Sequence, residues 1–102
     1  MELFRGDTFF KQIASNDYQF RVGDKLHIAV MENAYSKDYL YEEVITVKEE
    51  TNEIDFEIPV EKTSLFPIKR LLLEIELTTI DGIVQTNQYE LNVKADGIRE
   101  QN

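Results

Sequence analysis

The chain has 102 residues, and its 20 acidic and 11 basic side chains give a net charge of −9 at pH 7. This acidic balance disfavours a nucleic-acid partner, because affinity for a phosphate backbone depends on Lys and Arg. The sequence contains no cysteine, which excludes disulfide bonds and thiolate metal sites. No apolar run approaches the roughly 18 residues that cross a bilayer, so we expect no membrane segment.

Length and composition predict one soluble domain over residues 1–102, with a polar tail at residues 97–102 that is expected to fray. The first ten residues lack a basic region followed by an apolar core, so we expect no secretory signal and folding in the cytosol. The acidic charge is explained by solubility, with binding to a basic protein partner, or mimicry of nucleic-acid charge, as the alternative.

Short β-prone segments open the chain. Leu3-Phe4 and the run from Thr8 to Ala14 are separated by Arg5-Gly6-Asp7, which predicts a kink between two strand pieces. The letters of this tripeptide match the integrin-binding motif. Strand-forming residues on both sides of it favour a structural role instead.

The next region, from Tyr18 to Met31, has apolar residues at every second position and predicts strands with one buried face. Gly23-Asp24 interrupts it. His27, the only histidine, lies on the face opposite Leu26 and Ile28 and is expected at the surface. A general base needs a positioned partner, and no residue spacing supplies one, so we expect no catalytic residue here.

Residues 32–43 are polar and have no two-residue period, so they predict an irregular connection. They contain Tyr35, Tyr39 and Tyr41, three of the five tyrosines of the chain. Tyrosine is favoured at protein interfaces because it offers a large contact area with few rotatable bonds. These three residues are the candidate protein interface, with capping of the open end of the fold as the alternative.

Residues 44–48 and 53–58 predict a hairpin around a four-residue loop, with Val47 facing Ile54 and Ile45 facing Phe56. Alternation places Glu53, Asp55 and Glu57 together on the opposite face. Three carboxylates are the ligand type that Ca²⁺ prefers, but a flat strand spreads them about 7 Å apart. We therefore expect a solvated acidic face, no metal and no cofactor.

Pro59 ends that strand, because proline cannot donate to a strand ladder. The stretch from Thr63 to Phe66 predicts one helical turn capped by Thr63 or Ser64. Pro67 then releases the chain into its longest β segment, since a residue before proline disfavours helix.

That segment, residues 69–95, predicts a long β-hairpin. Its inward side chains alternate along both strands and are Leu71, Leu73, Ile75, Leu77, Tyr89, Leu91 and Val93. Asp81-Gly82 between the two runs is a strong hairpin signal.

The length of the hairpin loop decides which side chains share a face. A two-residue loop would pair Ile80 with Ile83 and turn Tyr89 toward Glu74, away from the other apolar residues. We therefore predict a longer loop, a type I turn with Gly82 at positive φ and a bulge. The expected pairs are Tyr89 with Ile75, Leu91 with Leu73, and Val93 with Leu71.

Six or seven short strands within about 95 residues, with turn signals between them, are typical of all-β sandwiches. The predicted fold is a seven-stranded antiparallel immunoglobulin-like β-sandwich, with a small β-barrel as the alternative. The chain has only four glycines, and its sequence contains no G-x-S-x-G, H-E-x-x-H, P-loop or Rossmann motif, so we expect no enzyme.

Several of these turn motifs occur in an order that resembles a known family. They are R-G-D-T at Arg5–Thr8, Gly23-Asp24 before an apolar strand, Thr63–Leu65, Asp81-Gly82, Gln85-Thr86 and the closing Leu91–Asp96. The sequence resembles small immunoglobulin-like structural modules of tailed phages and Firmicute prophages, of the baseplate upper protein kind. The resemblance spans roughly residues 4 to 96.

This resemblance implies a virion structural or assembly protein that acts through protein–protein contacts and has no catalytic residues. The expected partners are other virion proteins or further copies of the chain. The expected location is the host cytoplasm during assembly and then the virion. The alternative function is an acidic regulatory or inhibitory protein with a basic partner, whose binding would weaken strongly with salt.

Overall fold

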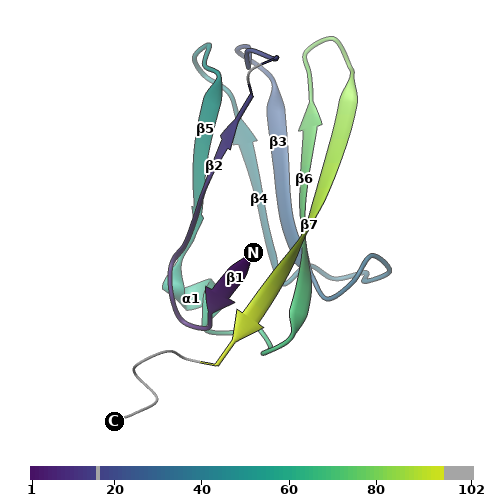
Figure 1. The fold of residues 1–102 in the computed structure, drawn as a ribbon. Coiled ribbons are helices and arrows are strands. Elements are labelled where there is room, and N and C mark those ends of the chain that lie inside the picture. The colour runs from purple at the N-terminus through teal and green to yellow at the C-terminus, as the bar shows by residue number, and fades with distance from the viewer. Residues whose placement is uncertain (16, 96–102) are drawn as a thin grey trace.

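The computed structural model describes residues 1–15 and 17–95, and the fold there is all-β, as predicted (Figure 1). Seven strands and one short helix follow one another within these residues. Their bounds are β1 Glu2–Phe4, β2 Phe9–Ala14, β3 Lys25–Met31, β4 Tyr41–Thr46, β5 Glu53–Ile58, α1 Val60–Thr63, β6 Arg70–Thr78 and β7 Val84–Lys94. The tail predicted to fray, residues 97–102, lies outside the described residues.

The strands form two sheets, one with the order β1-β7-β6-β3-β4 and one that contains only β2 and β5. The larger sheet is mixed, because β1 runs parallel to β7 with Leu3 beside Val93. The prediction of antiparallel pairing throughout is therefore wrong at β1. The chain turns at Gly6, with φ 88°, and passes from β1 in one sheet to β2 in the other, so β1 and β2 do not pair.

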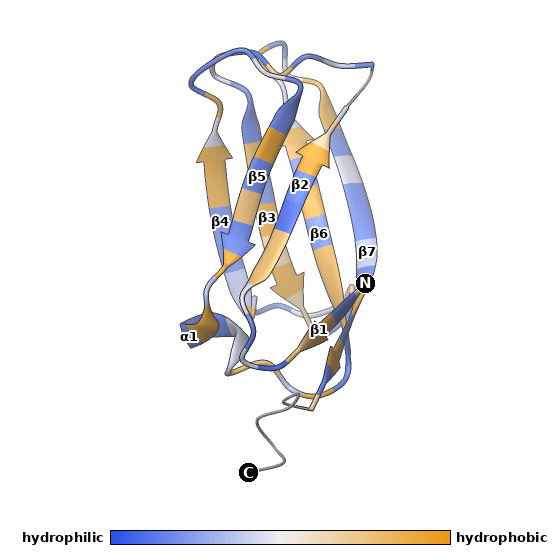
Figure 2. Cartoon of the chain, turned by 60° about the vertical axis from the view of Figure 1, so that its left-hand side comes forward, coloured by the Kyte–Doolittle hydropathy of each residue, from blue (hydrophilic) through white to orange (hydrophobic). Residues whose placement is uncertain are grey.

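The core lies between the facing sides of the two sheets (Figure 2). Phe9 of β2 packs against Phe56 of β5, with ring centroids 6.2 Å apart. The larger sheet contributes the buried residues Leu26, Ile28, Val30, Leu71, Leu73, Ile75, Leu91 and Val93. Phe66, in the connection after α1, closes one end and is almost completely buried.

The long hairpin has the predicted inward face but different pairs. Leu71 lies opposite Leu91 and Leu73 opposite Tyr89, a shift of two residues from the predicted pairs. The loop closes when Thr79 N donates to Ile83 O and Gly82 N donates to Thr79 O, both at 2.9 Å.

The conformation of Gly82 explains this register. Gly82 is the last residue of the loop and has φ 88°, which confirms the predicted positive φ. The predicted pairs would end the loop at Ile83 and require a left-handed backbone at a β-branched residue. Both registers bury the same face, so the backbone preference of glycine decides between them.

The predicted hairpin of residues 44–48 and 53–58 is wrong. β4 pairs with β3, where Ile45 lies opposite Leu26, and β5 pairs with β2, where Phe56 lies opposite Lys11. The connection between them crosses from one sheet to the other, with Thr51 N donating to Phe20 O at 3.1 Å. A hairpin would place both apolar faces on one sheet, whereas here they approach the core from opposite sides.

Two smaller predictions also need correction. Residues 18–22 form a loop with a single bridge between Phe20 and Thr51, not a strand. The helical turn comes earlier than predicted, at Val60–Thr63, so Thr63 is its last residue and not its cap. The buried Thr63 hydroxyl donates to the carbonyl oxygen of Asp7 at 2.7 Å and holds the helix against the β1–β2 turn.

No helix within residues 1–15 and 17–95 is long and apolar enough to cross a membrane.

We predict that Gly23→Ala destabilises the protein more than Gly82→Ala. Both glycines have positive φ, which costs alanine about 1 kcal/mol. A Cβ at Gly23 would also lie 2.9 Å from Cγ2 of Ile80, whereas nothing lies within 4 Å of one at Gly82. We expect a loss of about 1 kcal/mol at Gly82 and about 2 kcal/mol or more at Gly23 in chemical denaturation. Equal losses would contradict this packing.

Candidate interaction surfaces

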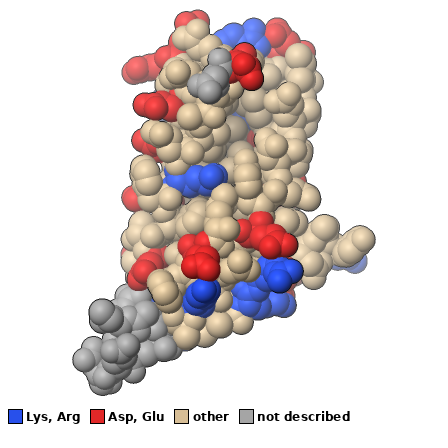
Figure 3. Space-filling view, in the orientation of Figure 1, with Lys and Arg blue, Asp and Glu red and all other residues tan. Residues whose placement is uncertain are grey.

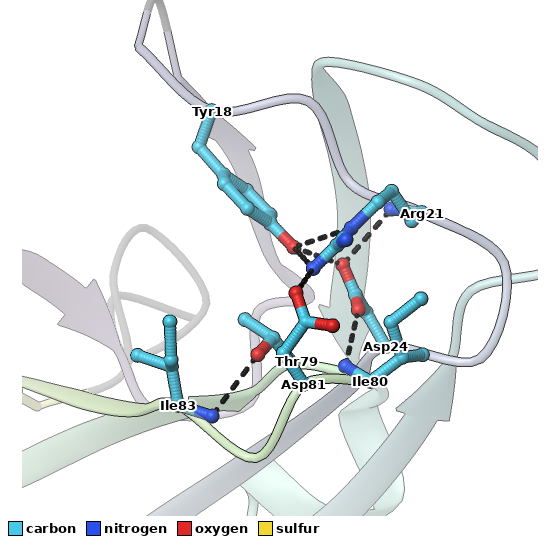
Figure 4. Close-up of polar contacts among 7 residues, drawn as sticks. All are labelled: Tyr18, Arg21, Asp24, Thr79, Ile80, Asp81 and Ile83. Atoms are coloured by element: carbon cyan, nitrogen blue, oxygen red, sulfur yellow. Dashed lines mark hydrogen bonds and ion pairs between the residues drawn. The ribbon is translucent and has the colours of Figure 1, made fainter.

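A buried carboxylate, Asp24, lies at the start of β3 and has no exposed surface (Figure 4). Its Oδ2 accepts hydrogen bonds from the hydroxyl of Tyr18 at 2.5 Å and from the backbone N of Arg21 at 2.9 Å. Its Oδ1 accepts one from the backbone N of Ile80 at 2.9 Å. Arg21 also forms a 2.7 Å ion pair with Asp81. Asp24 therefore joins the 18–24 loop to the β6–β7 loop.

Burial alone would raise the pKa of Asp24 and is the largest single influence on it. The hydrogen bonds from Arg21, Tyr18 and Ile80, together with the positive charge of Arg21, outweigh burial and lower the pKa of Asp24. The hydrogen bond to Asp24 raises the pKa of the Tyr18 hydroxyl in turn. Asp24 is thus an ionised carboxylate whose oxygens are all engaged within the protein.

The sequence analysis found only a break at Gly23-Asp24 and missed this network. One available signal was an acidic residue placed directly before a strand of alternating apolar residues. The other partners, Ile80 and Asp81, lie some 56 and 57 residues further along the chain, and no local pattern connects them with Asp24.

His27 of β3 is half-buried and its Nε2 lies 2.6 Å from Oε2 of Glu42. The edge of the His27 ring meets the ring of Tyr39, with centroids 5.7 Å apart. The histidine was expected at the surface without a partner, and the carboxylate partner comes from the neighbouring strand β4. The contact holds Tyr39 beside β3 and β4.

The structure places the three candidate interface tyrosines in different settings. Tyr35 is 93% exposed in the β3–β4 connection, and Tyr39 is 46% exposed. Tyr41 begins β4, is partly buried, and donates to Oε2 of Glu43 at 2.7 Å. Burial, followed by this hydrogen bond, raises the pKa of Tyr41 to about 12. Tyr35 and Tyr39 are available for contact, and Tyr41 is anchored within its own sheet.

The turn that presents Tyr35 is held by local hydrogen bonds. Asn33 Oδ1 accepts from Tyr35 N at 2.9 Å, and Ser36 Oγ accepts from Asn33 N at 3.1 Å. The backbone N of Ser36 also donates to the carbonyl oxygen of Asn33 at 3.1 Å. The exposed ring of Tyr35 therefore projects from an ordered turn.

The acidic residues of β5 lie on its outer face, as predicted: Glu53, Asp55 and Glu57 are exposed. Figure 3 shows acidic side chains along the left margin of the molecule, over this strand. Within the described part of the chain, no group of three potential ligands is arranged to hold a metal ion.

The upper half of β7 is an unpaired sheet edge. β1 pairs only with Asn92 to Lys94, and β7 continues upward to Val84 without a neighbour on that side (Figure 2). Asn92 N and Lys94 O bond to the β1 side, whereas Val93 N bonds to the β6 side. Alternation therefore directs the N–H and C=O groups of Val84, Thr86 and Gln88 outward. We call Val84–Gln88 the open edge.

A hollow of about 200 Å³ lies between the open edge and β2. Its floor is apolar and includes Ile13, Phe20 and Leu77, while Gln85 and Asn87 of β7 contribute amide groups. The two-stranded sheet does not extend far enough to cover this part of β7, so the inward face there is exposed.

No protein-family model, curated protein or solved structure matches the chain.

We predict that Asp24→Asn lowers the free energy of unfolding by about 2 kcal/mol at pH 7, because charged hydrogen bonds are lost in a buried site. Since the pKa of Asp24 is lowered on folding, its stabilisation is complete above the unfolded pKa of about 3.9 and declines as pH falls through the folded pKa. The difference between the two proteins should thus shrink below about pH 4.

The matched control is Asp55→Asn, at an exposed site on β5. It should change stability by less than about 0.5 kcal/mol. Denaturant titrations from pH 3 to pH 8 give both comparisons, and a loss at Asp24 no greater than that at Asp55 would contradict the assigned network.

Proposed function

We propose that this chain is an immunoglobulin-like β-sandwich module that acts through protein–protein contacts, as a structural or assembly protein of a tailed phage or prophage virion. In immunoglobulin-like sandwiches, strands G, F and C share one sheet, and B and E share the other. The order β7-β6-β3 in the larger sheet and the pair β2-β5 support this assignment. In this scheme β1 is the first strand and β4 extends the larger sheet.

The turn motifs behind the phage resemblance have a structural role that is consistent with this proposal. Gly6, Gly23 and Gly82, one from each of three motifs, all have positive φ between 88° and 96°. They form the turns at which the chain changes direction between strands. A related module would need glycine at the same places for the same reason.

The observation that carries the contact function is the exposure of Tyr35 on an ordered turn. A tyrosine with 93% of its surface exposed has almost no packing role within its own chain. The turn is already fixed by Asn33 and Ser36, so binding there costs little conformational entropy. An exposed aromatic ring on a fixed turn suits the centre of a protein interface.

The way in which the reactive side chains are used supports a non-catalytic role. Asp24 has no exposed surface, and its oxygens are held by three donors. His27 is paired with Glu42 against Tyr39, and no nucleophile lies in that group. The 200 Å³ hollow is lined by apolar and amide side chains and by the hydroxyl-bearing Ser15, Tyr18 and Tyr89, and no carboxylate or histidine is among its lining residues.

One observation favours the alternative, a regulatory or inhibitory protein with a basic partner. The exposed acidic row of β5 forms a negatively charged margin on one side of the molecule (Figure 3). Binding at this margin would weaken steeply as salt increases, because screening reduces attraction between exposed charges. Binding centred on Tyr35 would depend little on salt.

We predict that the chain is a component of purified particles induced from the phage or prophage that encodes it. Tyr35→Ser combined with Tyr39→Ser should reduce its incorporation roughly tenfold or more, since interface tyrosines are often worth over 1.4 kcal/mol each. Density-gradient purification followed by quantitative immunoblotting measures this incorporation.

Tyr41→Phe is the matched control, because it alters a tyrosine that is anchored within β4 and should leave incorporation unchanged. Absence of the wild-type chain from purified particles would overturn the proposed virion role. Equal incorporation of the double variant and the control would remove the tyrosines from the interface.

A further inference from the structure

The open edge differs chemically from the other exposed strand edges of the described chain. β1, β2, β4 and β5 each carry at least one charged residue, such as Lys11 on β2 or Glu42 on β4. The seven residues 83–89, IVQTNQY, carry none. In the orientation of Figure 3, the surface over upper β7 is a broad uncharged area.

Proteins usually protect an exposed strand edge with lysine, proline or a bulge, because unpaired backbone groups attract another strand. The open edge has none of these: it contains no proline, no charge and no interruption of the β6–β7 ladder. Val84, at its start, is 56% exposed, and the preceding Ile83 is 58% exposed. The edge is therefore equipped to pair with a further strand.

We propose that the open edge pairs antiparallel with the open edge of a second copy of this chain, across a two-fold axis at Thr86. This rests on the proposed contact function and adds its partner and location. In this register Thr86 lies opposite Thr86 of the second copy, Val84 lies opposite Gln88, and Gln88 lies opposite Val84. Each of these three pairs exchanges two hydrogen bonds, so about six backbone bonds join the copies.

The length of the free edge selects this register. β1 occupies the edge from Glu90 onward, where its Met1 donates to Glu90 O at 3.1 Å. With Thr86 on the axis, Tyr89 of one copy lies opposite Ile83 of the other, the first residue after the hairpin loop. The partner strand thus ends where β1 begins, and both copies use their whole free edge. Ile83 and Tyr89 form an aromatic–β-branched pair, which is favourable across strands.

The neutral charge of the edge permits a second copy as the occupant. Two chains of net charge −9 repel each other, so a contact between them must lie where few charges meet. The paired residues here are all neutral. Beside them, Glu90 and Asp81 form ion pairs with Arg70 and Arg21 of their own copy. Glu74 and Glu76 on β6 accept hydrogen bonds from Gln88 and Thr86 of their own copy. The β6 strands of the two copies would lie about 14 Å apart, beyond the screening length at 0.1 M salt.

The pair is also self-complementary on its inner face. There Gln85 of one copy lies opposite Asn87 of the other. Each of these side-chain amides has a donor and an acceptor, so the two can hydrogen-bond to each other. A two-fold contact uses the open edge of both copies and leaves none for a third, so the assembly closes as a dimer. The contact area is small, so the dimer should be reversible and should strengthen with salt as the repulsion is screened.

Because the chain has no cysteine, single-cysteine variants test the register directly. Hydrogen-bonded residues that face each other have Cα atoms about 5.5 Å apart, a distance that a disulfide spans. Under a glutathione redox buffer, Thr86→Cys should form a disulfide dimer roughly tenfold faster or more than Thr46→Cys, because pairing raises the effective concentration of the thiols. Thr46 is a matched exposed threonine on β4.

Light scattering of the purified chain at about 0.5 M NaCl, where screening favours association, measures the dimer directly. In about 0.1 M NaCl, where the added charges are only partly screened, Thr86→Lys should weaken it roughly tenfold, because two like charges would face each other on the axis. Thr46→Lys adds the same charge on β4 and should not weaken it. Thr86 points its backbone outward, so Thr86→Lys should keep the β6–β7 ladder, which circular dichroism checks.

Equal crosslinking of the two cysteine variants, or a monomer at every concentration, would overturn the edge dimer. Dimerisation of Thr86→Lys as strong as that of Thr46→Lys would also overturn it and would place self-association elsewhere. Saturable binding of a synthetic valine-rich peptide to a chain that stays monomeric would show that the open edge takes a strand from another protein, against this proposal. Virion incorporation is measured separately, so failure of the dimer leaves the proposed function to its own test.

Discussion

The buried carboxylate of Asp24 is the contact on which one whole end of the molecule depends. It holds the 18–24 loop and the β6–β7 loop together through backbone donors on both, Arg21 N and Ile80 N. A buried charge is tolerated only when it is fully hydrogen-bonded, and Tyr18 completes the set. Because this joint fixes the tip of the long hairpin, it also fixes where β7 begins and how its upper half projects beyond the two-stranded sheet.

The two-stranded sheet covers only part of the inward face of the five-stranded sheet. The smaller sheet has two strands and faces a sheet of five, so part of the larger sheet has no partner layer. β1 covers only the lower end of β7. The side chains have adapted to this: β7 is apolar where it is covered, at Leu91 and Val93, and neutral polar where it is open, at Gln85 and Asn87. The open part of β7, residues 84–88, carries no charge, whereas β4 and β5 carry exposed acidic residues.

The candidate surfaces occupy separate places on one scaffold. The turn with Tyr35 lies between β3 and β4, the acidic row follows β5, and the open edge follows β7. A module with several independent contact surfaces suits a role in an assembly, where each subunit meets more than one neighbour. The side chains that often perform chemistry, His27 and Asp24, are engaged in contacts that hold the fold together.

The sequence by itself determined the fold class, the inward faces of β3, β6 and β7, and the positive φ of Gly82, because these depend on alternation and on local backbone preference. It also suggested Tyr35 as an interface candidate, through the clustering of three tyrosines in one connection. Tertiary structure decided which strands pair. The β1–β7 pairing and the hydrogen bond between Ile80 and Asp24 join segments that are distant in the chain. β4 and β5, which are neighbours in the chain, lie in different sheets. An apolar face looks the same in a strand's own sequence whichever sheet it joins, so only packing of the whole core could select these partners.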